Sequence, residues 1–317
     1  MTRHLFVVDP LGPIDITKDS SFALLWAAQG RGDTLHTCDT DGLFAQGPRA
    51  FATCRQTTVA KRQGAHFAVS HPEVRPLGDF DAIWMRKDPP FDMQYIAATY
   101  VLDLAPPATK VFSRPDSLRN WNEKTSLLQF GDLAPPSLLT RDPKQIMRFQ
   151  AEVGGSVVIK PLGYSGGNGI VALHPGDLNT RSLLEITTRH GKEFVLAQKY
   201  LPQVVAGDKR VILVAGVARA GLLRIPPPDD LRGNIHIGAT TELSPLTERE
   251  QAVCTAIGPA LAAAGHLFVG IDLIGEQLTE INVTSPTGIH EIRDAGGPDL
   301  AEELLDAANA WQTGRAA

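Results

Sequence analysis

The sequence predicts a multidomain protein in which an open α/β layer is followed by an α+β region. Two observations lead to this prediction. Over the first 120 residues, strand candidates alternate with helical patterns, as in a sheet covered by helices. From about Asn122 onward, strand candidates adjoin one another without a helix between them, which indicates antiparallel pairs. The length of 317 residues is sufficient for two or three domains.

The first layer begins with a short apolar run at residues 4–8, HLFVV, which we interpret as a strand. A helix is predicted over residues 20–29, because its apolar side chains share one face and Asp19 or Ser20 can cap its first turn. A second strand is predicted at residues 82–85, AIWM, and it ends before two consecutive prolines.

The second region contains short strands that are predicted to pair locally. Their candidates lie at residues 157–160, 169–173, 194–199, 209–215, 267–274 and 278–284. The sequence contains no internal repeat that would indicate a solenoid or a propeller.

The composition argues against several classes of protein. The chain is 43% hydrophobic and 21% charged, as is usual for a globular domain. Its formal charge of -5 offers no surface for a polyphosphate backbone, so we expect no nucleic-acid partner. We also expect no export, because only four consecutive apolar residues precede Asp9, and no membrane partner, because no apolar run reaches the roughly 18 residues of a membrane span. Cys38, Cys54 and Cys254 are scattered without CxxC spacing, which fits a reducing cytoplasm.

A glycine-rich stretch, VVIKPLGYSGGNGIVAL at residues 157–173, is the first candidate for a binding site. Its four glycines are Gly163, Gly166, Gly167 and Gly169. The stretch is neither a dinucleotide fingerprint nor a Walker loop, because strands flank it on both sides and no terminal GK[ST] is present. Glycines reach the positive φ values with which backbone N–H groups cradle phosphate, and Lys160 precedes them as a point charge. A solvated surface hairpin is the alternative.

A predicted hairpin near the C-terminal end presents two carboxylates. If Ile274 pairs with Leu278 across a three-residue turn, Asp272 faces Glu280, because each acid lies two residues farther from the turn. Like charges in these positions destabilise a sheet by about 0.2–1 kcal/mol. A divalent cation between them would remove that cost.

Asn282 shares the face of the two acids, whereas the opposite face of the hairpin is uniformly apolar. Two carboxylates and an amide oxygen are hard ligands that suit magnesium, which is often shared with substrate phosphates. A solvated acidic hairpin is the alternative here.

Lysines and strand residues elsewhere allow a nucleotide site but do not require one. Lys124 lies where the first layer gives way to the second region, a natural place for a second phosphate-binding lysine, although most lysines are simply solvated. Gln198 and Tyr200 lie at the end of a predicted strand, where an extended backbone can bond to an adenine edge. They can equally be ordinary strand residues.

Arginines indicate an anionic substrate, because guanidinium groups bind carboxylates bidentately. The three candidates in the second region lie in the segments GDKRVILV and LRIPPPDDLRGN: Arg210, Arg224 and Arg232. In the first layer, Arg86 and the Asp19-Ser20 pair lie at a strand end and a helix start, where α/β layers bind ligands. Solvated surface residues are the alternative in each case. No Ser-His-Asp order or reactive-cysteine context indicates covalent catalysis by a side chain.

Several motifs together resemble one known family, the bacterial glutathione synthetases of the ATP-grasp superfamily. They are MRKDPPFD at 85–92, NEK at 122–124, IKPL at 159–162, GDKRV at 207–211, LTE at 246–248 and VGIDLIGEQLTEINVTSPTGI at 269–289. The opening DPLGPIDITKDSSFALL is also similar to the start of that family. The resemblance extends from about Val7 to about Asp306.

The resemblance implies three domains and a cytoplasmic homo-oligomer, a tetramer as in that family. Residues 1–120 would form an N-terminal pre-ATP-grasp α/β domain, residues 121–202 the small lid domain of the ATP-grasp fold, and residues 203–317 its C-terminal domain. ATP would bind between the last two.

The resemblance also implies roles for individual residues. ATP would be bound by Lys124, Lys160, the glycines at 163, 166, 167 and 169, Gln198, Tyr200, Leu201 and Asp208. Magnesium, with manganese as an alternative, would be held by Asp272, Glu280 and Asn282. Arg210 and Arg224 would be catalytic, and the substrates would contact Asp19, Ser20, Arg86, Arg232, Asn234 and Ser285.

The implied reaction joins γ-glutamylcysteine to glycine at the expense of ATP, through an acyl phosphate. In-line phosphoryl transfer depends on positioning and charge neutralisation, which agrees with the missing side-chain base. The chain departs from the family pattern at Gly163, at residues 235–240 and at Gly288-Ile289-His290. An ATP-grasp ligase with another amine or acyl substrate is therefore the first alternative, and a non-catalytic nucleotide-binding switch is the second.

Overall fold

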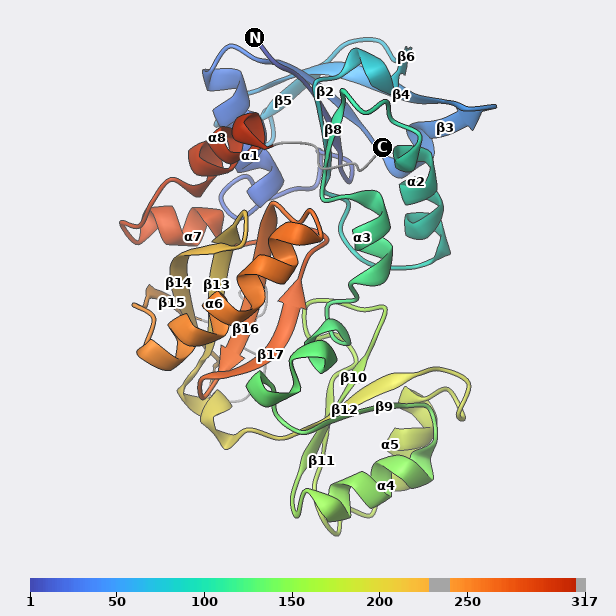
Figure 1. The fold of residues 1–317 in the computed structure, drawn as a ribbon, viewed down its shortest axis with the longest axis vertical. Coiled ribbons are helices and arrows are strands. Elements are labelled where there is room, and N and C mark those ends of the chain that lie inside the picture. Colours follow the sequence, from blue (N-terminus) through green and yellow to red (C-terminus); the bar gives the residue numbers. More distant parts are fainter. Residues whose placement is uncertain (228–239, 312–317) are drawn as a thin grey trace.

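The computed structural model describes residues 1–227 and 240–311, and it contains three sheets that follow one another along the long axis of the molecule (Figure 1). The N-terminal sheet lies at one end, a small sheet lies at the other, and the C-terminal sheet lies between them. Among the helices in these ranges, none combines the length and the apolar character needed to cross a bilayer.

The N-terminal sheet confirms the predicted open α/β layer. Its strands are β1 (Arg3–Val7), β2 (Thr34–Cys38), β3 (Leu43–Gln46), β4 (Arg49–Val59), β5 (Phe67–Val69), β6 (Glu73–Pro76), β7 (Ala82–Met85) and β8 (Lys110–Phe112). The order is β3-β4-β2-β1-β7-β8, and β5 and β6 both pair with β4. Strand β1 is parallel to β2 and β7, and β7 is parallel to β8, whereas β3 to β6 form an antiparallel extension.

Three helices and two short 3₁₀ turns accompany these strands. They are α1 (Ser20–Gly30), α2 (Met93–Asp103) and α3 (Pro115–Asn120), with short 3₁₀ turns η1 (Thr40–Gly42) and η2 (Leu77–Asp79). The predicted first helix is confirmed. Of its two candidate caps, Asp19 is the N-cap, since its carboxylate accepts a hydrogen bond from the backbone N–H of Phe22 at 2.6 Å.

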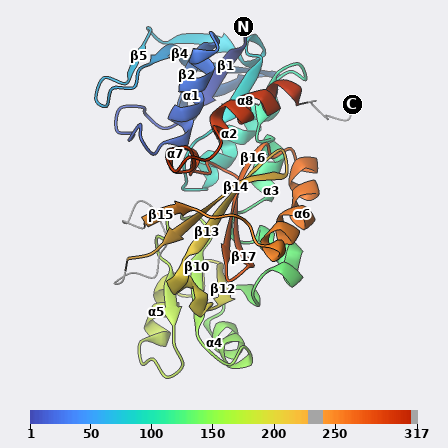
Figure 2. The same cartoon turned by 90° about the vertical axis from the view of Figure 1, so that its left-hand side faces the viewer.

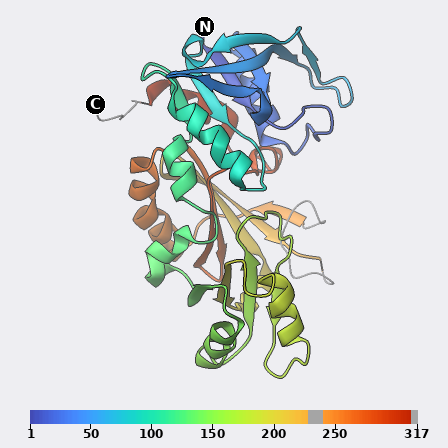
Figure 3. The ribbon, with the colours of Figure 1, turned by 90° about the vertical axis from the view of Figure 1, so that its right-hand side faces the viewer.

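The small sheet is antiparallel throughout and has a core of its own. Its strands are β9 (Ser137–Thr140), β10 (Val157–Pro161), β11 (Val171–Leu173) and β12 (Val195–Lys199), in the order β11-β10-β12-β9. The 3₁₀ segment η3 (Ser126–Leu133) precedes it. Helices α4 (Pro143–Glu152) and α5 (Thr180–Thr187) pack against the sheet through Ile146 and Leu184, and Figures 2 and 3 show both at this end of the molecule.

The C-terminal sheet consists of β13 (Asp208–Val214), β14 (Val217–Ile225), β15 (Thr240–Leu243), β16 (Phe268–Ile274) and β17 (Gln277–Asn282). Its order is β15-β14-β13-β16-β17, and every pairing is antiparallel. The accompanying helices are η4 (Pro202–Ala206), α6 (Glu248–Ala263), α7 (Ile289–Asp294) and α8 (Leu300–Ala310). The predicted α+β region is thus confirmed.

The N-terminal and C-terminal sheets share their hydrophobic cores. Phe6 of β1 and Ile212 of β13 belong to one cluster of buried side chains, in which α8 also packs. Arg31 at the end of α1 adds ion pairs to two acids of α8, Glu302 at 2.5 Å and Asp306 at 2.8 Å. The last helix therefore returns to the first domain, whereas most buried side chains of the small sheet form a cluster of their own.

Candidate active site

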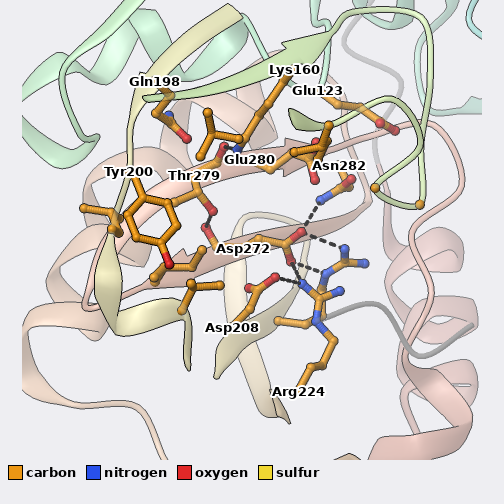
Figure 4. A pocket seen from close by; sticks show the side chains of 18 of the residues that line it. Glu123, Lys160, Gln198, Tyr200, Asp208, Arg224, Asp272, Thr279, Glu280 and Asn282 are labelled. Atoms are coloured by element: carbon orange, nitrogen blue, oxygen red, sulfur yellow. Dashed lines mark hydrogen bonds and ion pairs between the residues drawn. The ribbon is translucent and has the colours of Figure 1, made fainter. Parts of the chain in front are cut away.

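A cavity of about 430 Å³ opens between the small sheet and the C-terminal sheet, a size typical of small-molecule sites. Strands β10 and β12 provide one wall, and β13, β14, β16 and β17 provide the other. Figure 4 shows Gln198 and Tyr200 toward one end of the cavity and Glu123 and Asn282 toward the other. The site is therefore composite, with residues from two sheets facing each other.

The β16–β17 hairpin places Asp272 opposite Glu280, as predicted, and Asn282 on the same side. The predicted pairing of Ile274 with Leu278 is wrong, because Ile274 pairs with Gln277 across a two-residue turn. A β-bulge at Thr279 restores the register before the two acids are reached. The shorter turn shifts the register by one residue, and the bulge shifts it back by one. Asp272 therefore still pairs with Glu280.

Asp272 is held by two arginines. Arg210, its cross-strand neighbour on β13, donates from Nε to Oδ1 at 2.5 Å and from Nη2 to Oδ2 at 2.9 Å. Arg224 approaches the same Oδ1 at 2.9 Å, and Asn282 donates to Oδ2 at 3.2 Å. Burial alone would raise the pKa of Asp272, but the two guanidinium groups lower it well below its usual range. The two guanidinium groups therefore favour the ionised form of this carboxylate.

Asp208 shares Arg224 with Asp272 but remains incompletely satisfied. Its Oδ2 accepts from Arg224 Nη2 at 2.5 Å. Its other oxygen and the Nε of Arg224 are buried without a hydrogen-bond partner in the part of the chain that the structure describes. Burial raises the pKa of Asp208 to about 6 despite the arginine beside it. Both atoms remain available to a ligand.

Lys160 on β10 lines the cavity, and Lys124, which follows the lining residue Glu123, contacts Glu280 at its edge. Lys124 Nζ lies 3.3 Å from Glu280 Oε1 and donates to the carbonyl oxygen of Tyr164 at 2.5 Å. Lys160 Nζ donates to the carbonyl oxygen of Thr279 at 3.2 Å and has no carboxylate within ion-pair distance among the described residues. Burial lowers the pKa of Lys160 accordingly.

The glycine loop lies over this cavity only in part. Gly166 and Gly167 line it, with φ of 67° and 77°, values that favour glycine. Gly169 follows with φ of 73°, whereas Gly163 lines a second, much smaller cavity. The predicted hairpin is confirmed, since β10 and β11 pair on either side of the loop.

The three residues expected at the adenine line the cavity where the small sheet ends. Gln198 is buried on β12 and donates to Ser137 Oγ at 3.1 Å. Tyr200 and Leu201 follow directly and also line the cavity.

The other predicted substrate residues form a separate polar cluster between the N-terminal sheet and the segment before α7. The buried Arg86 donates to Ser21 Oγ at 3.1 Å and to the carbonyl oxygen of Pro286 at 2.9 Å. Ser285 donates to Asp88. The Ser20 hydroxyl is buried without a hydrogen-bond partner in residues 1–227 and 240–311, and burial raises the pKa of the neighbouring Asp19.

Arg210 connects this cluster to the cavity, because its Nη1 also approaches the carbonyl oxygen of Thr287 at 3.4 Å. The remaining predicted residues, Arg232 and Asn234, lie outside the described residues.

Glu123 and Thr279 line the cavity but were not predicted from the sequence. Glu123 directly precedes Lys124, so its proximity to a phosphate-binding candidate was the available signal. In a hairpin without a bulge, Thr279 would lie on the face opposite to Glu280 and Asn282. It lines the cavity because the bulge interrupts that alternation.

The donor set on the hairpin fits a hard divalent cation. Among the described residues, no three His, Cys, Asp or Glu side chains are grouped as a metal site by themselves. Asp272, Glu280 and Asn282 instead provide two carboxylates and an amide oxygen, which suit a metal that keeps waters and shares phosphate oxygens.

The antiparallel small sheet facing a second sheet, with lysines and oxygen ligands across a nucleotide-sized cavity, defines an ATP-grasp ligase. Solved structures support the fold. D-cycloserine synthetase DcsG superposes with a TM-score of 0.67 at 16% identity, covering 97% of this chain and 99% of that one. The ATP-grasp ligase PsnB, complexed with a minimal precursor, gives 0.62 at 20% identity, covering 98% of each chain.

The chain belongs to the prokaryotic glutathione synthetase family. The N-terminal domain of that family matches residues 2–119, and its ATP-grasp domain matches residues 123–297. The glutathione synthetase of Agrobacterium fabrum is 43% identical over 300 residues, which are 95% of this chain and 94% of the relative. That of Gloeobacter violaceus is 42% identical over 310 residues, covering 96% and 95%. The chain is therefore an ATP-dependent ligase.

Proposed function

We propose that the chain makes glutathione from γ-glutamylcysteine and glycine, converting ATP to ADP and phosphate. The observation that carries this proposal is the cavity between the two sheets. The ammonium group of Lys160, which has no carboxylate partner among the described residues, and that of Lys124 lie close to a set of carboxylate and amide oxygens there. Relatives named glutathione synthetase match nearly the whole chain, so a ligase with other substrates is not favoured.

ATP is proposed to lie along the cavity with adenine beside Gln198, Tyr200 and Leu201. The triphosphate then extends toward Lys160 and Lys124, under the N–H groups of the loop glycines. Support comes from Lys160, a buried ammonium group without a carboxylate partner among the described residues, which a phosphate oxygen would satisfy. The unpartnered carboxylate oxygen of Asp208 is proposed to accept a hydrogen bond from a hydroxyl group of the ribose.

Asp272, Glu280 and Asn282 are proposed to hold the divalent cation, with magnesium preferred and manganese tolerated because both accept oxygen ligands. The cation would supply neutralisation of phosphate charge. Its proposed ligands lie on rigid strands whose opposite face packs in the core. Their positions therefore do not depend on a loop.

The proposed chemistry has two steps. A carboxylate oxygen of γ-glutamylcysteine attacks the γ-phosphorus, the bond to the β-phosphate oxygen breaks, and ADP leaves. The ammonium group of glycine then loses one proton to water, the freed nitrogen attacks the acyl carbon, the acyl–oxygen bond breaks, and the second proton goes to the departing phosphate. Arg210 and Arg224 are proposed to stabilise the negative charge that develops on the acyl oxygen.

The acyl substrate is proposed to bind at Asp19, Ser20, Arg86 and Ser285, with Arg232 and Asn234 contributing from outside the described residues. Arg86 supports this placement, because it is buried yet has no carboxylate partner within ion-pair distance in residues 1–227 and 240–311. A cytoplasmic location and a tetrameric assembly stay predictions.

The proposed function is tested by supplying the purified protein with ATP, magnesium and γ-glutamylcysteine, together with a panel of amino acids. We expect ADP release that depends on glycine and a product with the mass of glutathione. ADP release with another amine but not with glycine would refute the assignment.

A further inference from the structure

Among the residues that the structure describes, Glu123 is the charged side chain at the metal-ligand end of the cavity to which the proposed reaction gives no role. The other acids around the cavity each have a cation within ion-pair distance: Asp272 has Arg210 and Arg224, Asp208 has Arg224, and Glu280 has Lys124. Glu123 has no such partner among the described residues. Within the described part of the chain, its carboxylate accepts one hydrogen bond, from the hydroxyl of Thr284 at 2.6 Å.

The backbone fixes Glu123 beside the reacting groups. Its carbonyl oxygen accepts a hydrogen bond from the N–H of Ile281 at 2.9 Å, between the proposed ligands Glu280 and Asn282. Figure 4 shows its side chain at the end of the cavity away from Tyr200 and therefore beyond the proposed triphosphate.

The surroundings of Glu123 suit a small cationic group. The residue lines both the large cavity and a small one of about 10 Å³, space for a single water-sized group. Phe91, Trp121 and Leu162 form much of the wall of the small cavity, so it is mainly apolar. Burial, together with the charge of Glu280, raises the pKa of the Glu123 carboxyl. A cation beside it would remove that electrostatic cost.

Two ammonium groups occur in the substrates of the proposed reaction, one on the acceptor and one on the γ-glutamyl end of the donor. The donor's ammonium group lies several bonds from the carboxylate that reacts. The acceptor's nitrogen must itself reach the acyl carbon, next to the proposed metal ligands and Lys124. Glu123 directly precedes Lys124 in the chain, and its carbonyl oxygen bonds to Ile281 between two of the proposed ligands.

We propose that Glu123 binds the ammonium group of the acceptor amino acid and so selects a cationic amine. This inference rests on the proposed function. The acceptor would donate to the carboxylate oxygen that Thr284 leaves free.

The test compares Glu123→Gln with Glu152→Gln, an exposed acid on α4 far from the cavity. Gln keeps the shape of the side chain and the bond from Thr284. The first measurement is the KM of glycine and of γ-glutamylcysteine in the complete reaction. The second is acyl hydroxamate formation from ATP, γ-glutamylcysteine and hydroxylamine without glycine, because hydroxylamine is uncharged at neutral pH and needs no carboxylate.

For Glu123→Gln we expect the KM of glycine to rise about 10- to 150-fold, because this range corresponds to the loss of one charge-assisted hydrogen bond. Hydroxamate formation and the KM of γ-glutamylcysteine should remain at wild-type values. Glu123→Asp, which keeps the charge, should recover part of the glycine affinity. Thermal melting of both variants, compared with Glu152→Gln, verifies that they are folded.

Three outcomes would overturn the proposal. They are an unchanged KM of glycine, a rise confined to the KM of γ-glutamylcysteine, and a parallel loss of hydroxamate formation, which would place Glu123 in the phosphoryl-transfer step. Failure of the proposed function is distinguishable, because it would appear in the wild-type protein as absence of hydroxamate and of ADP release.

Discussion

His266 provides a quantitative test of burial, because its imidazole is fully buried and neither ring nitrogen has a hydrogen-bond partner in the described part of the chain. The ring packs edge-on against Trp121, with ring centroids 5.3 Å apart. Burial, with a smaller contribution from Arg114, lowers its pKa from 6.5 to about 3. The native state therefore holds this histidine neutral.

The sign of the pH effect follows from proton binding. Below the unfolded-state pKa, the unfolded chain binds a proton at His266 that the native state refuses, so stability falls as pH falls. From pH 6.5 down to about pH 5, this loss amounts to about 2 kcal/mol, at 1.36 kcal/mol per pH unit. It would reach about 4–5 kcal/mol near the folded-state pKa.

His266→Leu removes both unpartnered nitrogens and the titration. We expect the variant to be more stable than wild type by about 1 kcal/mol at about pH 7.5, and by about 3 kcal/mol at about pH 5. Urea unfolding followed by tryptophan fluorescence at both pH values measures the difference. His71→Leu, at an exposed position, is the control and should show no such trend. Equal gains of His266→Leu at both pH values would refute the buried neutral histidine.

Three further predictions concern the charges of the site and of the sheet behind it. Glu280→Gln should raise the magnesium concentration needed for half-maximal activity and lower turnover steeply, measured by magnesium titration; wild-type titration would remove Glu280 from the metal site. Lys160→Met should raise the KM of ATP about 10- to 150-fold, measured by ADP release, because one phosphate oxygen loses a charged partner; an unchanged KM would contradict this. Lys209→Met should destabilise the fold by about 3–5 kcal/mol, because it leaves the buried Glu250 carboxylate without the ammonium group that lies 2.7 Å away in the wild-type protein. Restored stability in the Lys209→Met, Glu250→Gln double variant is the matched control for that loss.

The acidic hairpin shows both the strength and the limit of reasoning from alternation. The opposition of Asp272 and Glu280 was predictable from the residue pattern. The two-residue turn was not, because it places Glu276 at φ of 65°, a conformation that residues with a Cβ seldom adopt. The bulge at Thr279 breaks the alternation that the prediction assumed.

The arginine fork on Asp272 could not be predicted from the sequence in the same way. Arg210 and Asp272 are cross-strand neighbours on β13 and β16, and Asp208 and Arg224 are neighbours on β13 and β14. The first pair is 62 residues apart in the chain, so its pairing depends on which strands become adjacent in the sheet. Local patterns predict the strands, but the long-range order of a sheet follows from packing of the whole domain.

The two sides of the cavity are held by different hydrophobic cores, one shared by the N-terminal and C-terminal sheets and one within the small sheet. Arg86 and Arg210 both contact the segment before α7, through the carbonyl oxygens of Pro286 and Thr287. They are anchored in sheets that share their cores, so the groups proposed to bind the acyl substrate are held in a fixed relation. The small sheet packs mainly within its own core, and it carries Lys160, Gln198 and the loop glycines. We therefore expect the nucleotide side of the cavity to open and close without disturbing the acyl side.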